Sequence, residues 1–264
     1  MNVLLTTPVD LRNPGQFLAS CGLLELADRM QPDGLTRPMG QFVEMGFRLH
    51  GAMQSVSALI GHLARCQPSR ESLGDTGDAL AALAALKLPS LCLWLDWWRE
   101  PNGQKEPFKK TAFKLWAGQQ TSQNIYSTLQ KTVATMCETN KSMATDPFHS
   151  RAGLTGRFGF DPGAAWNALD AGFSPNEQGY NVASSPVVEL LAAIGLQRFR
   201  PVPEADDRDA FRYLAWSTPL PVDVAAAAAA GAVADPKPRV FRFRIASRGS
   251  YGSFTSATEI GRLS

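Results

Sequence analysis

The segment that most constrains the fold is residues 91–98, Leu-Cys-Leu-Trp-Leu-Asp-Trp-Trp. Three tryptophans and three leucines within eight residues are typical of a β-strand, and side chains of this size need a substantial core to cover them. A chain of 264 residues is long enough to provide such a core. We therefore predict a buried strand over residues 91–98, inside a globular protein.

Other strand signals are scattered along the chain. Short apolar or alternating runs predict strands at residues 3–7, 41–50 (one strand or a hairpin pair), 157–160, 211–216 and 240–246. They do not alternate regularly with the helical segments. The order therefore favours an α+β fold, a mixed sheet with flanking helices and long polar loops, over a doubly wound sheet.

Helical spacing of apolar residues marks the remaining elements. Asn13 can cap a helix that has Pro14 at its first position and runs to about Met30. Helices are also expected at residues 56–66, 75–87, 121–139 and 186–194, the last with Gly195 as its stop. The alanine run at 224–233 is either a weak helix or a low-complexity loop. We expect a main α+β domain over residues 1–201. Residues 202–264 then form a C-terminal extension with a basic strand, packed on the same core.

Several classes of protein are disfavoured by what the chain lacks. No run of 18 apolar residues suggests a membrane segment, and the N-terminus does not resemble a secretory signal. Four separated cysteines and three histidines give no metal-binding pattern, and no Walker loop or serine-nucleophile elbow occurs. We therefore expect a cytoplasmic protein that is not an enzyme, with no metal and no cofactor. Cys21 and Cys92 are expected to be buried, Asp96 to be structural, and Glu25 and Asp28 to lie on a solvated helix face.

Charge is distributed unevenly although the net charge is only +2. Residues 99–157 carry nine basic side chains against four acids: Arg99, Lys105, Lys109, Lys110, Lys114, Lys131, Lys141, Arg151 and Arg157. Residues 237–264 carry six against one acid: Lys237, Arg239, Arg242, Arg244, Arg248 and Arg262. Residues 202–235 are acidic. Local basic excess of this kind indicates either a footprint for a polyanion or an ordinary solvated face.

Two polar loops, at residues 99–112 and 140–156, are the best candidates for binding nucleic acid. Lysines attract phosphates, and amides can read base edges. The candidate contacts are Asn102, Gln104, Lys105, Lys109 and Lys110 in the first loop, and Asn140, Lys141 and Arg151 in the second. Arg242 and Arg244 share one face of the basic strand. The polar run 119–124 suits either phosphate binding or an ordinary helix cap. We expect the two basic stretches to converge around one sugar-phosphate strand.

Three segments resemble motifs of a known family. Residues 13–27, 157–178 and 185–201 begin Asn-Pro-Gly-Gln-Phe-Leu, Arg-Phe-Gly-Phe-Asp-Pro and Ser-Pro-Val-Val-Glu-Leu. They resemble Csb-type subunits of type I-U (type I-G) CRISPR-associated systems. The resemblance implies a large-subunit-like role in a Cascade surveillance complex for antiviral defence. Such a subunit recognises the motif that flanks the target (the PAM) and helps to open the duplex, while guide pairing reads the sequence.

The resemblance also implies a set of partners. They are the guide RNA, the target double-stranded DNA, the other Cascade subunits and a helicase-nuclease that is recruited after target binding. The chain is short for a large subunit, which puts some of these tasks in doubt. Two alternatives stay open. One is a purely structural assembly subunit. The other is a CRISPR RNA-processing endonuclease, which would need His149 with a Tyr or Lys partner.

Overall fold

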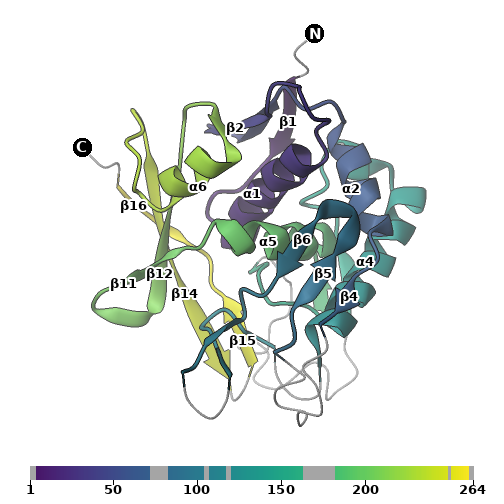
Figure 1. Ribbon diagram of the computed structural model, residues 1–264. Coiled ribbons are helices and arrows are strands. Elements are labelled where there is room, and N and C mark those ends of the chain that lie inside the picture. Colours follow the sequence, from purple (N-terminus) through teal and green to yellow (C-terminus); the bar gives the residue numbers. More distant parts are fainter. Residues whose placement is uncertain are drawn as a thin grey trace.

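Helices and strands follow one another irregularly and build a mixed α+β fold, as the sequence predicts (Figure 1). The computed structural model describes residues 4–71, 83–103, 107–116, 120–162, 182–248 and 251–261. Within these ranges the side chains of Leu4, Lys141, Ala144, Val182 and Arg248 are not described. In Figure 1, α1 and α5 lie in the middle, α2 and α4 on one side and the long C-terminal strands on the other.

The helices largely follow the sequence signals. They are α1 (Pro14–Arg29), α2 (Val56–Arg65), α4 (Ser122–Thr139), α5 (Pro186–Arg198), α6 (Val222–Ala229) and the short 3-10 turns η1 (Pro89–Leu91) and η2 (Lys141–Ala144). The Asn13 side chain accepts a hydrogen bond from the Gln16 N–H and caps α1, as predicted. The alanine run forms α6, so its helical interpretation is confirmed.

The strands of the described residues form five antiparallel groups. The N-terminal sheet has the order β1 (Leu4–Pro8), β3 (Gly46–His50), β2 (Met39–Val43), β13 (Leu220–Pro221). The C-terminal sheet has the order β11 (Val202–Glu204), β12 (Asp207–Ala215), β14 (Arg239–Arg248), β15 (Tyr251–Phe254), with β16 (Thr258–Gly261) also on β14. Three small groups are β4 (Ser69–Arg70), β5 (Leu86–Leu88) and β6 (Leu93–Leu95); β7 (Arg99–Pro101) and β8 (Phe108–Lys110); and β9 (Ala152–Leu154) and β10 (Val182–Ser184).

A single buried cluster joins residues of both 1–201 and 202–264. Phe17 of α1 stacks on Tyr213 of β12 with ring centroids 4.1 Å apart. The Tyr213 hydroxyl donates to the Leu11 carbonyl at 2.6 Å. The C-terminal sheet and the N-terminal helix therefore share one core, and neither can be removed without exposing aromatic surface.

Helices α1 and α5 touch through glycines. A Cβ atom added at Gly22 would overlap the Leu191 carbonyl, and one added at Gly195 would overlap the Leu18 carbonyl. The prediction that Gly195 ends its helix is therefore wrong: α5 continues to Arg198. Gly195 is needed for close helix packing rather than for a C-terminal turn.

Residues 157–160 do not form the predicted strand, because a buried carboxylate takes the hydrogen bonds that a sheet would have made. Glu189, fully buried on α5, accepts N–H groups from Phe158, Gly159, Phe160 and Asp161 at 2.9–3.1 Å. Burial raises the pKa of the Glu189 carboxyl; the charge of Arg157 and the N–H donors lower it only in part.

The same region ties the two central helices together. The Asp161 carboxylate accepts from the Asn13 amide at 2.8 Å and from the Ser185 N–H at 3.0 Å. Asn13 caps α1 and Ser185 caps α5. The three segments that carry the family resemblance therefore meet in one buried polar network.

The tryptophan-rich segment 91–98 is only partly a strand. Leu93–Leu95 forms β6, whereas Leu91 ends η1. Trp97 and Trp98 lie beyond β6 and are fully buried, but Trp94 is 43% exposed. The helix expected at residues 75–87 is wrong at its end, where Leu86 and Lys87 belong to β5; residues 72–82 lie outside the described part of the chain. The expected loop 99–112 contains the β7–β8 hairpin.

Candidate nucleic-acid interface

The β7–β8 hairpin is anchored by Arg99. Its guanidinium is only 8% exposed and pairs with Glu71 at 2.9 Å. It also lies 4.1 Å from the ring centre of Phe108. A nearly buried arginine that has both a carboxylate and an aromatic partner holds the base of the hairpin in place.

The lysines of this hairpin differ in their partners. Lys109 pairs with Glu100 at 3.2 Å, and both are exposed. Lys110 is exposed, and no carboxylate in the described ranges pairs with it. Burial lowers the pKa of Lys114, and the charge of nearby Lys110 lowers it further. The two lysines therefore create a local positive potential that favours an anion.

The other candidates of the first loop are less informative. The Asn102 N–H donates to the Pro107 carbonyl at 3.1 Å, and the residue is half-buried. Gln104 and Lys105 lie outside the described residues.

The second loop is organised by its own hydrogen bonds. The Asn140 side-chain oxygen accepts from the Ser142 N–H at 2.9 Å and so caps η2. The hydroxyls of Ser142 and Ser150 lie 2.8 Å apart, which brings Arg151 close to η2. Arg151 is exposed, without a carboxylate partner among the described residues. Lys141 is the first residue of η2. Asn140 therefore has a structural task that the sequence did not reveal.

Three arginines of β14 are ion-paired. Asp207 accepts from both Arg242 and Arg244. Glu259 holds Arg239 at 2.8 Å. These acids come from strands that pair directly with β14. The acidic segment 202–235 and the basic segment after it are therefore neighbours in space, and their charges largely cancel.

The two basic stretches touch through apolar side chains. Phe113, just after β8, packs against Phe211 of β12 at 4.9 Å. Phe211 is paired with Phe243 on the buried face of the sheet. Arg242 and Arg244 alternate with these residues and lie on the opposite, exposed face. The two stretches meet at this ring contact, and Arg242 and Arg244 already share Asp207. The described contacts do not place the lysines of the first stretch beside these arginines, so convergence around one strand stays a prediction.

A basic, aromatic surface that the sequence analysis missed lies on β4–β6. Ser69, Lys87 and Trp94 are aligned across the three strands by their register. The Lys87 ammonium lies 4.1 Å from the Trp94 ring centre. Arg70 and Lys87 are exposed and have no carboxylate partner in the described ranges. Alternation with buried Leu93 and Leu95 was the signal that could have placed Trp94 outside the core.

His149 lies at a separate cavity. Its Nδ1 is 2.7 Å from Asp146, and its Nε2 is 3.4 Å from the Gln16 amide nitrogen. The cavity has a volume of about 490 Å³, and its walls include Arg12 and Arg239. No Tyr or Lys is found among the described residues that line it. The partner that the endonuclease alternative needs is therefore not found there.

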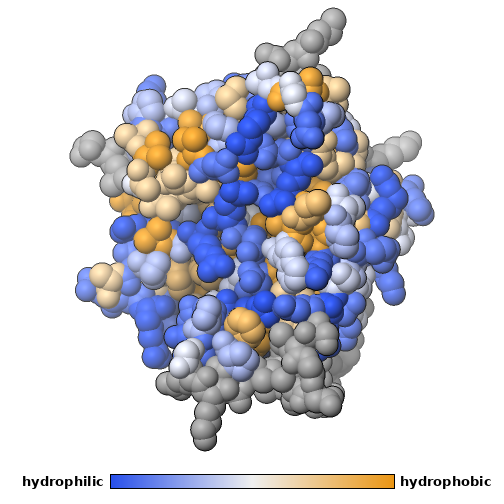
Figure 2. Space-filling model, in the orientation of Figure 1, coloured by the Kyte–Doolittle hydropathy of each residue, from blue (hydrophilic) through white to orange (hydrophobic). Residues whose placement is uncertain are grey.

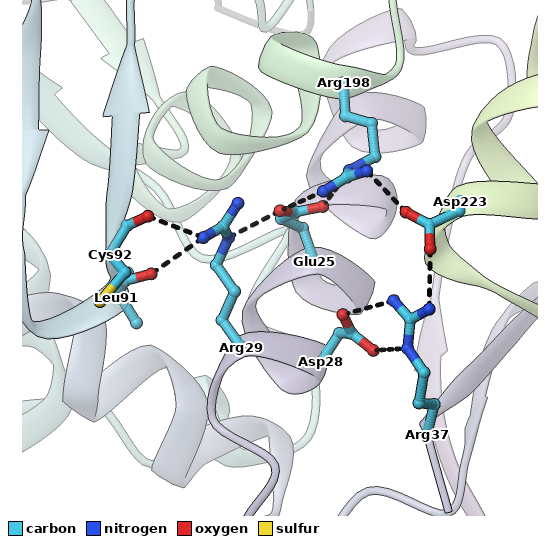
Figure 3. Close-up of polar contacts among 8 residues, drawn as sticks. All are labelled: Glu25, Asp28, Arg29, Arg37, Leu91, Cys92, Arg198 and Asp223. Atoms are coloured by element: carbon cyan, nitrogen blue, oxygen red, sulfur yellow. Dashed lines mark hydrogen bonds and ion pairs between the residues drawn. The ribbon is translucent and has the colours of Figure 1, made fainter. Parts of the chain in front are cut away.

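An alternating chain of ion pairs joins α1, α5 and α6 (Figure 3). Glu25 is buried and accepts from Arg29 and Arg198 at 2.6–2.7 Å. Asp223 then links Arg198 to Arg37, which also pairs with Asp28. Hydrogen bonding to Glu25 raises the pKa of Arg198, and the Arg37 guanidinium lowers the pKa of Asp223.

This network corrects two sequence expectations. Glu25 and Asp28 form internal ion pairs rather than a solvated face. Cys92 is exposed, in a left-handed conformation with φ 47°, and its carbonyl accepts from Arg29. Because each carboxylate is paired with guanidinium groups, we interpret the network as structural: it holds α1, α5 and α6 together. In Figure 2, a hydrophilic strip crosses the middle of this face, while hydrophobic side chains gather over α6.

Comparison with family models, curated proteins and solved structures found no match. Among the helices that the structure describes, none is both long and apolar enough to cross a membrane. The described side chains also include no cluster of three or more metal-ligating groups.

Proposed function

We propose that this chain is a non-catalytic, cytoplasmic subunit of a CRISPR RNA-guided surveillance complex. In this role the β7–β8 hairpin contacts the backbone of the target duplex beside its flanking motif. The guide RNA and the other Cascade subunits are its partners. A helicase-nuclease recruited after target binding would do the cutting.

The observation that carries the proposal is the positive potential at Lys110 and Lys114. Lys110 has no carboxylate partner in the described ranges, and its charge lowers the pKa of Lys114. A phosphate placed beside Lys110 would relieve this repulsion and release counterions. The hairpin itself is held by nearly buried Arg99, so binding would require little ordering of the backbone.

The family resemblance supports the choice of complex. Its three motif segments meet at Asp161 and Glu189, where they hold the N-terminal ends of α1 and α5. The motif positions are therefore explained by folding. Contact with nucleic acid is assigned to other residues, on the exposed hairpins.

The test is the salt dependence of duplex binding by the full chain, measured by fluorescence anisotropy with a labelled DNA duplex. Lys110→Glu is expected to weaken binding and to reduce the slope of log affinity against log salt by about one. Lys237→Glu is the matched control, because Lys237 is exposed, lies outside the hairpins and undergoes the same charge change. It should leave the slope unchanged.

Two results would contradict the proposal in different ways. Equal effects of the two variants would show that the hairpin is not the contact. If the wild-type chain does not bind duplex but co-purifies with guide RNA and partner subunits, the chain is a structural assembly subunit instead.

A further inference from the structure

The exposed face of β4–β6 carries an aromatic side chain that the core does not use. Trp94 is 43% exposed, whereas its neighbours Leu93 and Leu95 are buried. Trp97 and Trp98 of the same run are fully buried and fill the core. Exposure alone is common for single side chains, but a tryptophan that has a lysine ammonium over its ring offers both an aromatic face and a positive charge for a contact. Figure 1 shows these strands at the front of the molecule, crossing over α5.

The surroundings of Trp94 are basic. Lys87 lies directly across from it on β5, with its ammonium over the ring. Arg70, on the edge strand β4, is also exposed, but it is aligned with buried Leu86 and so lies outside the row of Trp94 and Lys87. Neither cation pairs with a carboxylate in the described ranges. Ser69 completes the row and is small and polar. The ring is therefore bordered by positive charge and a hydroxyl rather than by an apolar rim.

We propose that Trp94 and Lys87 form a stacking platform for an unpaired base of single-stranded nucleic acid. A base stacks on the exposed part of the indole, and Lys87 contacts the neighbouring phosphate. Stacking on an aromatic ring next to cations is the general way in which proteins hold single strands without reading their sequence. This inference rests on the proposed function and adds a second contact, for the strand that becomes unpaired when the duplex opens.

Single-stranded nucleic acid explains the surface better than a protein partner does. A protein contact centred on tryptophan is normally surrounded by apolar residues that exclude water. Here the neighbours of Trp94 on the exposed face are Lys87 and Ser69. Charge complementarity therefore favours a polyanion with flat rings.

The experiment measures binding of a labelled oligo(dT) strand to the full chain. Trp94→Ala is expected to weaken binding by between about fivefold and about a hundredfold, the range for loss of one stacked base. Trp94→Phe should keep most of the affinity because it retains an aromatic face. Tyr251→Ala is the control, since Tyr251 is also an exposed aromatic but lies on the C-terminal sheet. It should bind like the wild type.

The outcomes separate this inference from the proposed function. If Trp94→Ala binds oligo(dT) like the wild type while Lys110→Glu still weakens duplex binding, the platform is wrong and the function stands. If Trp94→Ala keeps oligo(dT) binding but loses partner subunits on co-purification, Trp94 is a protein contact and the inference is overturned. If the wild-type chain binds neither nucleic acid, both proposals fail. An unchanged urea midpoint for Trp94→Ala shows that a loss of binding is not caused by unfolding.

Discussion

Two regions of this molecule are rich in cations, and they differ in what those cations face. In the C-terminal sheet, Arg242 and Arg244 share Asp207. On the β4–β6 sheet and the β7–β8 hairpin, here called the hairpins, Arg70, Lys87 and Lys110 have no carboxylate partner among the described residues. The number of basic residues in a segment therefore does not show how much charge is available. The charge that a ligand can meet depends on whether the neighbouring strand brings carboxylates beside the basic residues.

The physical reason lies in the strand pairing. Antiparallel pairing of β12 with β14 puts residues from an acidic segment next to arginines that are distant along the chain. Exposed pairs of this kind contribute little to stability, about 0–1 kcal/mol. They do, however, reduce the positive potential that a polyanion would meet. On the hairpins, Arg99 and Lys109 are also paired, but Arg70, Lys87 and Lys110 lack this compensation in the part that the structure describes.

The largest effect, on the free energy of unfolding, is expected from replacing Arg99, which anchors the β7–β8 hairpin. Arg99→Ala leaves Glu71 without its partner and exposes Phe108, so we expect a loss of about 2–3 kcal/mol in the free energy of unfolding. Urea denaturation of the variant and the wild type measures this loss. Arg208→Ala is the control, because Arg208 is 94% exposed, and it should change stability very little. If the two variants are equally stable, the hairpins do not depend on Arg99.

A smaller effect, on duplex binding, should follow from removing the carboxylate partner of the arginines in the C-terminal sheet. Asp207→Asn removes the carboxylate that Arg242 and Arg244 share, while the strand can still form. We expect duplex binding to tighten several-fold at low salt, with a salt slope steeper by about one to two. The measurement is the same anisotropy titration that tests Lys110.

Asp209→Asn provides the control for this prediction. Asp209 is on the same strand, and its only described ion pair is a long one with Arg208, at 3.9 Å. It should change the binding much less. Equal behaviour of the wild type and Asp207→Asn would mean that carboxylate pairing does not distinguish the two regions.

The smallest effect concerns the connection between β12 and β14. Burial raises the pKa of Asp235, but hydrogen bonds from Ser217, Lys237 and Thr218 outweigh it and hold the pKa below its usual value. A lowered pKa in the folded state stabilises the protein above about pH 4, and this contribution is lost as the pH falls through the lowered value. Asp235→Asn should therefore cost about 1 kcal/mol at pH 7, after allowance for solvent screening.

The pH dependence provides the check on this prediction. Unfolding in urea should show a difference between Asp235→Asn and the wild type at pH 7 that disappears at strongly acidic pH. Asp33→Asn, at an exposed position without a described ion pair, should show no such difference. A difference that stays constant with pH would mean that the carboxylate charge plays no part in this turn.

Local signals were sufficient for much of the fold. Asn13 and Pro14 start α1, and α4 begins after Thr121, whose hydroxyl accepts the Asn124 N–H. The alternating run at 41–50 became the β2–β3 hairpin. In each of these cases the decisive contacts lie within a few residues, so caps and periodicity carry the information.

The site was harder to predict, because charge pairing is a long-range property. The sequence placed Lys110 among the candidates but could not separate it from Arg242 and Arg244, whose partner Asp207 is 35 and 37 residues away. It also missed Trp94 and Lys87, since all three tryptophans of residues 91–98 were assigned to the core.

What the sequence by itself determined is the α+β class, the position of most helices and that of β1, β2, β3, β12 and β14, because these follow from the pattern of apolar residues and caps. Only the tertiary structure decided which polar groups are used internally. The Glu189 carboxylate accepts hydrogen bonds from the N–H groups of residues 158–161, which a neighbouring strand would otherwise have accepted. Gly195 lies within α5, although it was expected to end this helix. A hydrogen bond or an ion pair is made with whatever group the fold brings near, and that group is usually far away along the chain.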